Sequence, residues 1–271
     1  MTDPATATGP VPGFEASTFS HAGREREVYR AGSGPAVIVI HEMPGLHPGV
    51  AAFGQRLVGA GYRVYLPSLF GRPGVPFNGR AMAGSMLRAC VSREFVMLAD
   101  RTSPVAGWLR ALAAQAHSDC GGPGVGAVGM CFTGGFALAM AVEPAVLAPV
   151  VSQPGLPIPL TARHRAAVGL DAADLAAVSE RARQGLCVLG LRFSNDMGSP
   201  PERFQTLRRE LGAGFEAIEI DSSPGNPHGI GTRAHSVLTV ELVDEPGHPT
   251  KAALDRVMAF LDERLRPQPH P

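Results

Sequence analysis

The sequence predicts an α/β protein with one mostly parallel central sheet and helices on both faces. Short β-branched apolar runs alternate along the chain with amphipathic segments, which is the pattern of successive βαβ units. The runs are apolar at almost every position, as expected of strands covered on both faces. A length of 271 residues suits a single large α/β domain. We expect a flexible tail over residues 1–20 and one domain over residues 21–271.

The predicted elements follow in chain order, with Gly and Pro between them as punctuation. The predicted strands are AVIVI (36–40), YRVYLP (62–67), VGAVGM (125–130), VLAPVVS (146–152), LCVLGLRF (186–193) and FEAIEI (215–220). The predicted helices cover residues 50–61, 95–117, a segment from 132, 172–183, 200–212 and 250–265. Ligands of such open sheets bind beyond the carboxyl ends of the strands, so residues that directly follow a strand are the first candidates for a site.

Composition argues against several classes of protein. Lys+Arg and Asp+Glu both number 24, so the chain has no excess positive charge to hold nucleic acid. The N-terminal residues lack the basic and apolar regions of a secretory signal, and we expect a cytoplasmic protein. The apolar stretch 134–160 contains a Glu-Pro pair and four more prolines, which disfavours a membrane span. The four cysteines lack CxxC spacing, which disfavours a zinc site and a disulfide framework: Cys90, Cys120, Cys131 and Cys187.

The stretch GAVGMCFTGG is typical of a nucleophile elbow, in which a strand meets a helix at a sharp turn. Such a turn carries its nucleophile at the tip and small residues two positions to either side. Gly129 fits the position before the tip, whereas Thr133 stands where glycine is commonest. Cys131 at the tip would face a helix N-terminus, which favours a thiolate and can stabilise an oxyanion. The alternative is a buried core cysteine in a tight turn.

Later loops supply an acid and two candidate bases in the chain order that this arrangement requires. Asp196 follows the strand at 186–193 and precedes a helix; its alternative role is that of a turn residue near a helix start. His228 and His235 both follow the strand at 215–220. We prefer His235, because it follows a small residue and leaves a shorter gap before the last helix, and keep His228 as the alternative base. His248 stands just before that helix and is a weaker candidate.

The stretch HEMPGLH, after the strand at 36–40, looks at first like a metal motif. A zinc peptidase needs HExxH on one helix, so that both imidazoles face one ion. Here His41 and His47 are six residues apart and a Pro-Gly pair interrupts the segment, so the metal interpretation fails. A class I glutamine amidotransferase also has a cysteine elbow, but it needs a His-x-Glu downstream, and none follows Cys131.

Taken together, these motifs resemble the dienelactone hydrolase family of α/β-hydrolases over residues 25–266. They are strand-G-x-C-x-small-G, an earlier strand that ends in glutamate, an Asp before Pro-Pro-Glu-Arg, and a final His-Ser. The resemblance implies the α/β-hydrolase fold. It also implies a catalytic triad formed by Cys131, Asp196 and His235, or His228 in place of His235.

The resemblance implies further roles near the nucleophile. Glu42 would contact the resting thiol and be displaced by substrate, which would release the thiolate. The backbone N–H groups of Phe132 and Met43 would form the oxyanion hole. His41, at the end of the same strand as Glu42, is expected to line or support the pocket and is our second candidate for substrate binding.

Family members of the dienelactone type bind a substrate carboxylate with arginines. Arg93 is the candidate here, because a guanidinium can bind a carboxylate bidentately; its alternative role is a surface ion pair with Glu94 or a neighbour. A second family arginine lies four residues beyond the histidine, where this chain has Thr239, or Thr232 if the base is His228. This departure puts the dienelactone substrate itself in question.

The implied activity is that of a carboxylesterase that hydrolyses a small-molecule ester or lactone through a thioester. This activity requires no cofactor and no metal. We expect no nucleic-acid partner and no membrane association, and we expect a monomer or a small homo-oligomer. The alternative is a catalytically silent α/β-hydrolase scaffold that binds a small molecule or senses oxidants through Cys131.

Overall fold

The computed structural model describes residues 9–78, 101–155 and 161–266. Its strands are β1 (Glu15–His21), β2 (Arg24–Ala31), β3 (Ala36–Ile40), β4 (Arg63–Pro67), β5 (Val125–Met130), β6 (Val146–Ser152), β7 (Val188–Phe193) and β8 (Phe215–Ile220). Its helices are α1 (Pro48–Gly59), α3 (Val105–Cys120), α4 (Gly134–Met140), α5 (Ala162–Ala166), α6 (Ala172–Arg183), α7 (Pro201–Leu211) and α8 (Pro249–Leu265), with single 3₁₀ turns η2 (Cys131–Thr133) and η3 (Gly212–Gly214). None of the helices in these ranges has the length and apolar character to span a bilayer.

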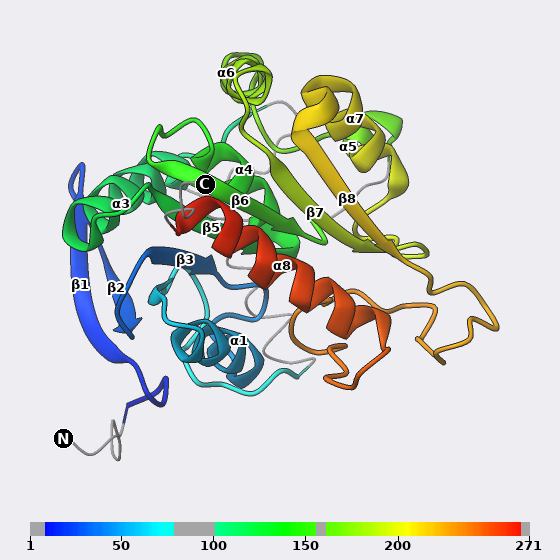
Figure 1. Cartoon of the computed structure of the whole chain (residues 1–271), viewed down its shortest axis with the longest axis horizontal. Coiled ribbons are helices and arrows are strands. Elements are labelled where there is room, and N and C mark those ends of the chain that lie inside the picture. The colour runs from blue at the N-terminus through cyan, green and yellow to red at the C-terminus, as the bar shows by residue number, and fades with distance from the viewer. Residues whose placement is uncertain (1–8, 79–100, 156–160, 267–271) are drawn as a thin grey trace, which may run out of the picture.

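The eight strands form one sheet in the order β1-β2-β4-β3-β5-β6-β7-β8, with helices above and below it (Figure 1). From β4 to β8 neighbouring strands run parallel, as the βαβ pattern predicts. β2 pairs antiparallel with β4 and with β1. The prediction of a mostly parallel sheet with helices on both faces is therefore confirmed.

The β1–β2 hairpin is the main element that sequence patterns missed. Most residues of β1 are exposed, and β2 begins with four consecutive charged residues, so neither strand has the apolar run of a buried strand. The pairing extends from Glu15↔Arg30 to His21↔Arg24. The tail predicted over residues 1–20 was therefore too long, because β1 begins at Glu15.

The core consists of two layers, one on each face of the sheet. Successive residues of β3 point to opposite faces, so Ile38 belongs to one layer and Val39 to the other. Helices α3, α4, α6 and α7 contribute to the first layer, and α1 and α8 to the second. This double burial explains why the inner strands are apolar at nearly every position.

The strand order brings distant sequence motifs to one edge of the sheet. Ile40 at the end of β3 pairs with Gly129 of β5, and Met130 at the end of β5 pairs with Ser152 of β6. The carboxyl ends of β3, β5 and β6 therefore lie side by side, and β7 follows next in the sheet. The predicted site residues come directly after these ends or from the long loop after β8.

Candidate active site

Cys131 lies at the tip of a sharp turn between β5 and α4. Its φ angle is +55°, in the left-handed region that few residues other than glycine adopt. A Cβ on Gly129 would lie 2.2 Å from the carbonyl oxygen of Thr133, so only glycine allows the turn to close. The side chain of Cys131 is partly exposed. A strained, accessible residue on a strand-to-helix turn has the geometry of a nucleophile elbow.

Thr133 has a structural reason to stand where glycine is commonest. Its hydroxyl accepts the N–H of Met130 at 3.0 Å and lies 2.9 Å from the carbonyl oxygen of Ile40. The side chain is fully buried. The hydroxyl therefore ties the end of β5 to the end of β3, just before the His-Glu pair, and holds the two halves of the candidate site together.

The structure places His235, and not His228, beside the predicted acid. Nδ1 of His235 lies 2.7 Å from Oδ2 of Asp196. The Cys131 side chain lies near the same ring and raises the pKa of His235. His228 is exposed and packs edge-on against His248, with the ring centroids 5.5 Å apart. Cysteine, histidine and aspartate from three loops thus form a continuous chain of contacts.

The electrostatics of this chain favour a charged pair. Burial would lower the pKa of His235, but the charge of Cys131 and the hydrogen bonds to Asp196 and Cys131 outweigh it and raise that pKa well above the ordinary range. The imidazolium therefore persists at neutral pH when it faces a thiolate. Such a pair is the reactive state of a cysteine nucleophile.

Two buried arginines hold the acid loop, and sequence reasoning missed both. Oδ1 of Asp196 accepts the N–H of Gly198 at 2.8 Å. Arg192 of β7 donates to the Ser199 carbonyl at 2.8 Å, and Arg203 of α7 donates to the Gly198 carbonyl at 3.2 Å. Both arginine residues are 1% exposed. A charged residue inside the apolar run LCVLGLRF was the available signal for Arg192.

Arg203 also joins the acid loop to two other segments. It donates to the carbonyls of Pro154, His164 and Ala167 at 2.6, 2.9 and 2.5 Å. Burial lowers its pKa to about 10, which still leaves the guanidinium charged at neutral pH. The negative charges of Asp196 and Cys131 raise the pKa of Arg203 and partly offset the effect of burial. The guanidinium therefore interacts favourably with both groups.

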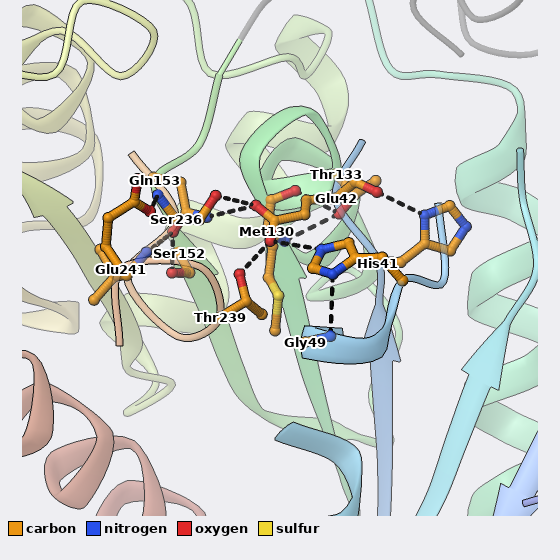
Figure 2. A network of polar contacts seen from close by, with 12 residues as sticks. His41, Glu42, Gly49, Met130, Thr133, Ser152, Gln153, Ser236, Thr239 and Glu241 are labelled. Atoms are coloured by element: carbon orange, nitrogen blue, oxygen red, sulfur yellow. Dashed lines mark hydrogen bonds and ion pairs between the residues drawn. The ribbon is translucent and has the colours of Figure 1, made fainter. Parts of the chain in front are cut away.

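Glu42 lies at the centre of a buried polar network (Figure 2). Its carboxylate accepts hydrogen bonds from Ser236 Oγ at 2.6 Å, from Gln153 Nε2 at 3.3 Å and from the Thr239 hydroxyl. His47 Nε2 lies 3.1 Å from Oε1, the oxygen that also accepts the Thr239 hydroxyl, whereas Ser236 and Gln153 bind Oε2. Burial would raise the pKa of Glu42, but the hydrogen bonds from His47, Ser236 and Thr239 lower it overall, so the group stays ionised.

The hydrogen-bond partners of Glu42 are side chains other than the Cys131 thiol. Among the residues that the structure describes, the Glu42 carboxylate makes its hydrogen bonds to four other side chains and none to Cys131. Two of the four donors, Ser236 and Thr239, come from the loop after β8. Sequence patterns could not place this loop, because it contains neither a helix nor a strand before α8.

His41 is a buried clasp between the end of β3 and the loop after β4. Its side chain is completely buried. Nδ1 lies 3.0 Å from the Glu42 carbonyl, and Nε2 accepts the N–H of Leu69 at 3.1 Å, so both ring nitrogens are used. Burial lowers its pKa to about 4, which keeps the ring neutral. His41 thereby fixes the loop after β4 to the end of β3.

The two residues proposed for the oxyanion hole lie in turns that follow β5 and β3. Phe132 directly follows Cys131 in η2, at the start of the turn that leads into α4. Met43 lies inside a tight turn that the N–H of Gly45 closes on the Glu42 carbonyl at 2.9 Å. Arg93 lies outside the described residues. Within the described ranges no group of three His, Cys, Asp or Glu side chains could hold a metal ion.

A mostly parallel sheet, an elbow after β5 and an aspartate–histidine pair from later loops together define an ester hydrolase of the α/β-hydrolase class. The sequence model of the dienelactone hydrolase family matches residues 26–264. The chain belongs to this family.

Solved structures with the same fold include several hydrolases. A putative dienelactone hydrolase from Klebsiella pneumoniae subsp. pneumoniae aligns at a TM-score of 0.62 with 18% identity, over 92% of this chain and 99% of the other. A dienelactone hydrolase-like promiscuous phosphotriesterase from metagenomic libraries aligns at 0.60 with 17% identity, over 93% and 98%. Thermogutta terrifontis esterase 2, phosphonylated by sarin, aligns at 0.60 with 14% identity, over 97% and 100%. No curated protein sequence matches the chain significantly.

Proposed function

We propose that this protein hydrolyses carboxylic esters or lactones with Cys131 as nucleophile, His235 as general acid and base, and Asp196 as the group that orients His235. The observation that carries the proposal is the contact chain from the strained Cys131 through His235 to Asp196. The nucleophile, the base and the orienting acid each have a partner within hydrogen-bond reach, which is the arrangement that covalent acyl transfer requires.

In the first half of the proposed reaction, the Cys131 thiolate attacks the carbonyl carbon and a C–S bond forms. The carbonyl electron pair moves to oxygen, where the N–H groups of Phe132 and Met43 stabilise the charge. As the tetrahedral intermediate collapses, the bond to the leaving alcohol breaks and the His235 imidazolium gives that oxygen its proton. The product of this half is an acyl thioester on Cys131 and, for a lactone, a ring-opened alcohol.

In the second half, neutral His235 removes a proton from water, and the resulting hydroxide attacks the thioester. Collapse of the second intermediate expels the Cys131 thiolate and releases the carboxylic acid, while His235 keeps the proton. Asp196 holds the Nδ1 side of the ring throughout, so that the other nitrogen serves the nucleophile and the water.

Glu42 has a different place in this scheme from the one that the family resemblance implies. Held by four donors and ionised, it is not free to take a proton from the thiol in the observed arrangement. Activation of Cys131 therefore falls to His235. The sulfur, the base and the acid then suffice for the chemistry, and Glu42 supports the surrounding loops.

The proposal is tested by the turnover of a panel of p-nitrophenyl esters and lactones by the purified protein and its variants. Cys131→Ala should lower kcat by several orders of magnitude. Cys187→Ala is the matched control, because Cys187 is a partly exposed thiol that directly precedes β7, at the amino end of that strand. Full turnover by the Cys131 variant would refute the proposal. Stoichiometric labelling of Cys131 by iodoacetamide without turnover of any ester or lactone would instead favour the thiol-sensor alternative.

A further inference from the structure

Two carboxylates, those of Glu42 and Glu241, accept hydrogen bonds from Ser236, the residue that directly follows the proposed base His235. We call this pair of hydrogen bonds the Ser236 grip. The N–H of Ser236 donates to Oε2 of Glu241 at 2.6 Å, and the Ser236 hydroxyl donates to Oε2 of Glu42 at 2.6 Å. Ser236 is 4% exposed. Figure 2 shows Ser236 between these two side chains, within the network around Glu42. The proposed mechanism uses Glu241 in no step.

The Ser236 grip lies next to His235, in a segment that has no helix or strand to fix the backbone of this histidine. Between Ile220, the last residue of β8, and the start of α8, the chain forms turns and irregular loop. The hydrogen bond that His235 Nδ1 donates to Asp196 orients the ring but does not fix the backbone that carries it. The turn after His235 is closed in both directions: the N–H of Glu241 donates to the Ser236 carbonyl at 3.1 Å, while the Glu241 carboxylate accepts the Ser236 N–H.

The surroundings of the Glu241 carboxyl group disfavour its charged form. Burial raises its pKa, and the negative charge of Glu42 raises it further, whereas the N–H groups of Ser236 and His235 and the charge of His235 lower it. The side chain of Glu241 is therefore held here by its hydrogen bond to Ser236, which it shares with Glu42, and this bond links the base to the buried network.

We infer that Glu241 is a positioning residue for His235, acting with Glu42 through Ser236. The inference rests on the proposed function, since it assigns the held histidine the role of base. Loss of the grip should let the backbone of His235 drift, which weakens its contact with the Cys131 sulfur while Asp196 still binds the ring.

The test compares Glu241→Ala with Glu241→Gln, whose amide oxygen can still accept the Ser236 N–H. Glu245→Ala is the control, because Glu245 is an exposed carboxylate of the same loop. Two readouts are used: kcat and KM for an ester substrate, and the pH midpoint of iodoacetamide alkylation of the Cys131 peptide. Glu241→Ala should lower kcat about tenfold, the factor expected for one lost hydrogen bond, with KM nearly unchanged. Its alkylation midpoint should move to higher pH, because a displaced imidazolium stabilises the thiolate less.

Glu241→Gln should restore most of kcat and the midpoint, and Glu245→Ala should match the parent. Ser236→Ala, which keeps the backbone bond to Glu241 and loses the one to Glu42, should shift the midpoint in the same direction and thus tests the grip if Glu241→Ala fails to fold. A folded Glu241→Ala or Ser236→Ala protein with the parent midpoint and kcat would overturn the inference. The alkylation readout needs no turnover, so failure of this inference is distinguishable from failure of the proposed function.

Discussion

His41 provides a stability prediction whose size follows from the structure. The ring is neutral in the folded protein, with a pKa of about 4, and titrates near 6.5 when the chain is unfolded. Below about pH 6.5, His41 therefore binds a proton in the unfolded chain but not in the folded protein. The free energy of unfolding falls as the pH drops below this value. With about 1.4 kcal/mol per pH unit, this single group should remove about 2 kcal/mol of the free energy of unfolding between pH 7 and pH 5.

The perturbation that isolates this effect is His41→Gln. Glutamine can still accept the N–H of Leu69 and donate to the Glu42 carbonyl, but it does not titrate. Urea unfolding at pH 7, 6 and 5 gives the free energy of unfolding for both proteins. Other groups titrate equally in both, so the parent should lose about 2 kcal/mol more than the variant over this range. Parallel pH dependence in the two proteins would refute the assignment of His41 as a buried neutral clasp.

Two further predictions concern the elbow and the acid. Thr133→Val keeps the shape of the side chain but leaves the buried Met130 N–H without its acceptor, and should lower the free energy of unfolding by about 1–3 kcal/mol in urea titrations. Thr206→Val is the control and should cost clearly less, because the Thr206 hydroxyl donates to the Glu202 carbonyl of its own helix. Asp196→Asn removes a charge that raises the pKa of His235, so the alkaline limb of the kcat/KM profile should move to lower pH and kcat should fall roughly 100-fold or more. An unmoved limb would show that Asp196 is only a turn residue.

The inner part of the fold could be predicted because its signal is local. Strands such as Ala36–Ile40 and Val125–Met130 are buried on both faces, and their composition alone marks them. The β1–β2 hairpin could not be predicted in this way, since an edge strand such as Glu15–His21 is largely exposed and carries no apolar run. The same contrast explains why helix positions agreed well whereas the start of the domain did not.

The candidate site was predictable where a residue directly follows a strand. Cys131 follows β5 directly and Asp196 lies in the loop just after β7, and parallel strands bring their carboxyl ends together. The choice between His228 and His235 depended on a long loop whose path is set by tertiary contacts, here the hydrogen bonds of Asp196 and of the carboxylates around Ser236.

The role of Glu42 was the least predictable, for the same physical reason. A carboxylate at a strand end binds whichever donors the fold brings to it, and three of its four donors lie more than a hundred residues away in sequence. His41 illustrates the converse. Its position at a strand end suggested a site residue, whereas its burial and its bond to Leu69 show that it holds a neighbouring loop.

The most direct test of the account is to identify the acylated residue during turnover. The protein is mixed with an excess of p-nitrophenyl acetate, quenched in acid within the first turnovers, digested, and mapped by mass spectrometry. If Cys131 is the nucleophile, an acetyl group should appear on the peptide that contains Cys131 in the parent and be absent after Cys131→Ala. Steady turnover with no acetyl group on that peptide, or with the acetyl group on another residue, would contradict the claim that Cys131 is the nucleophile.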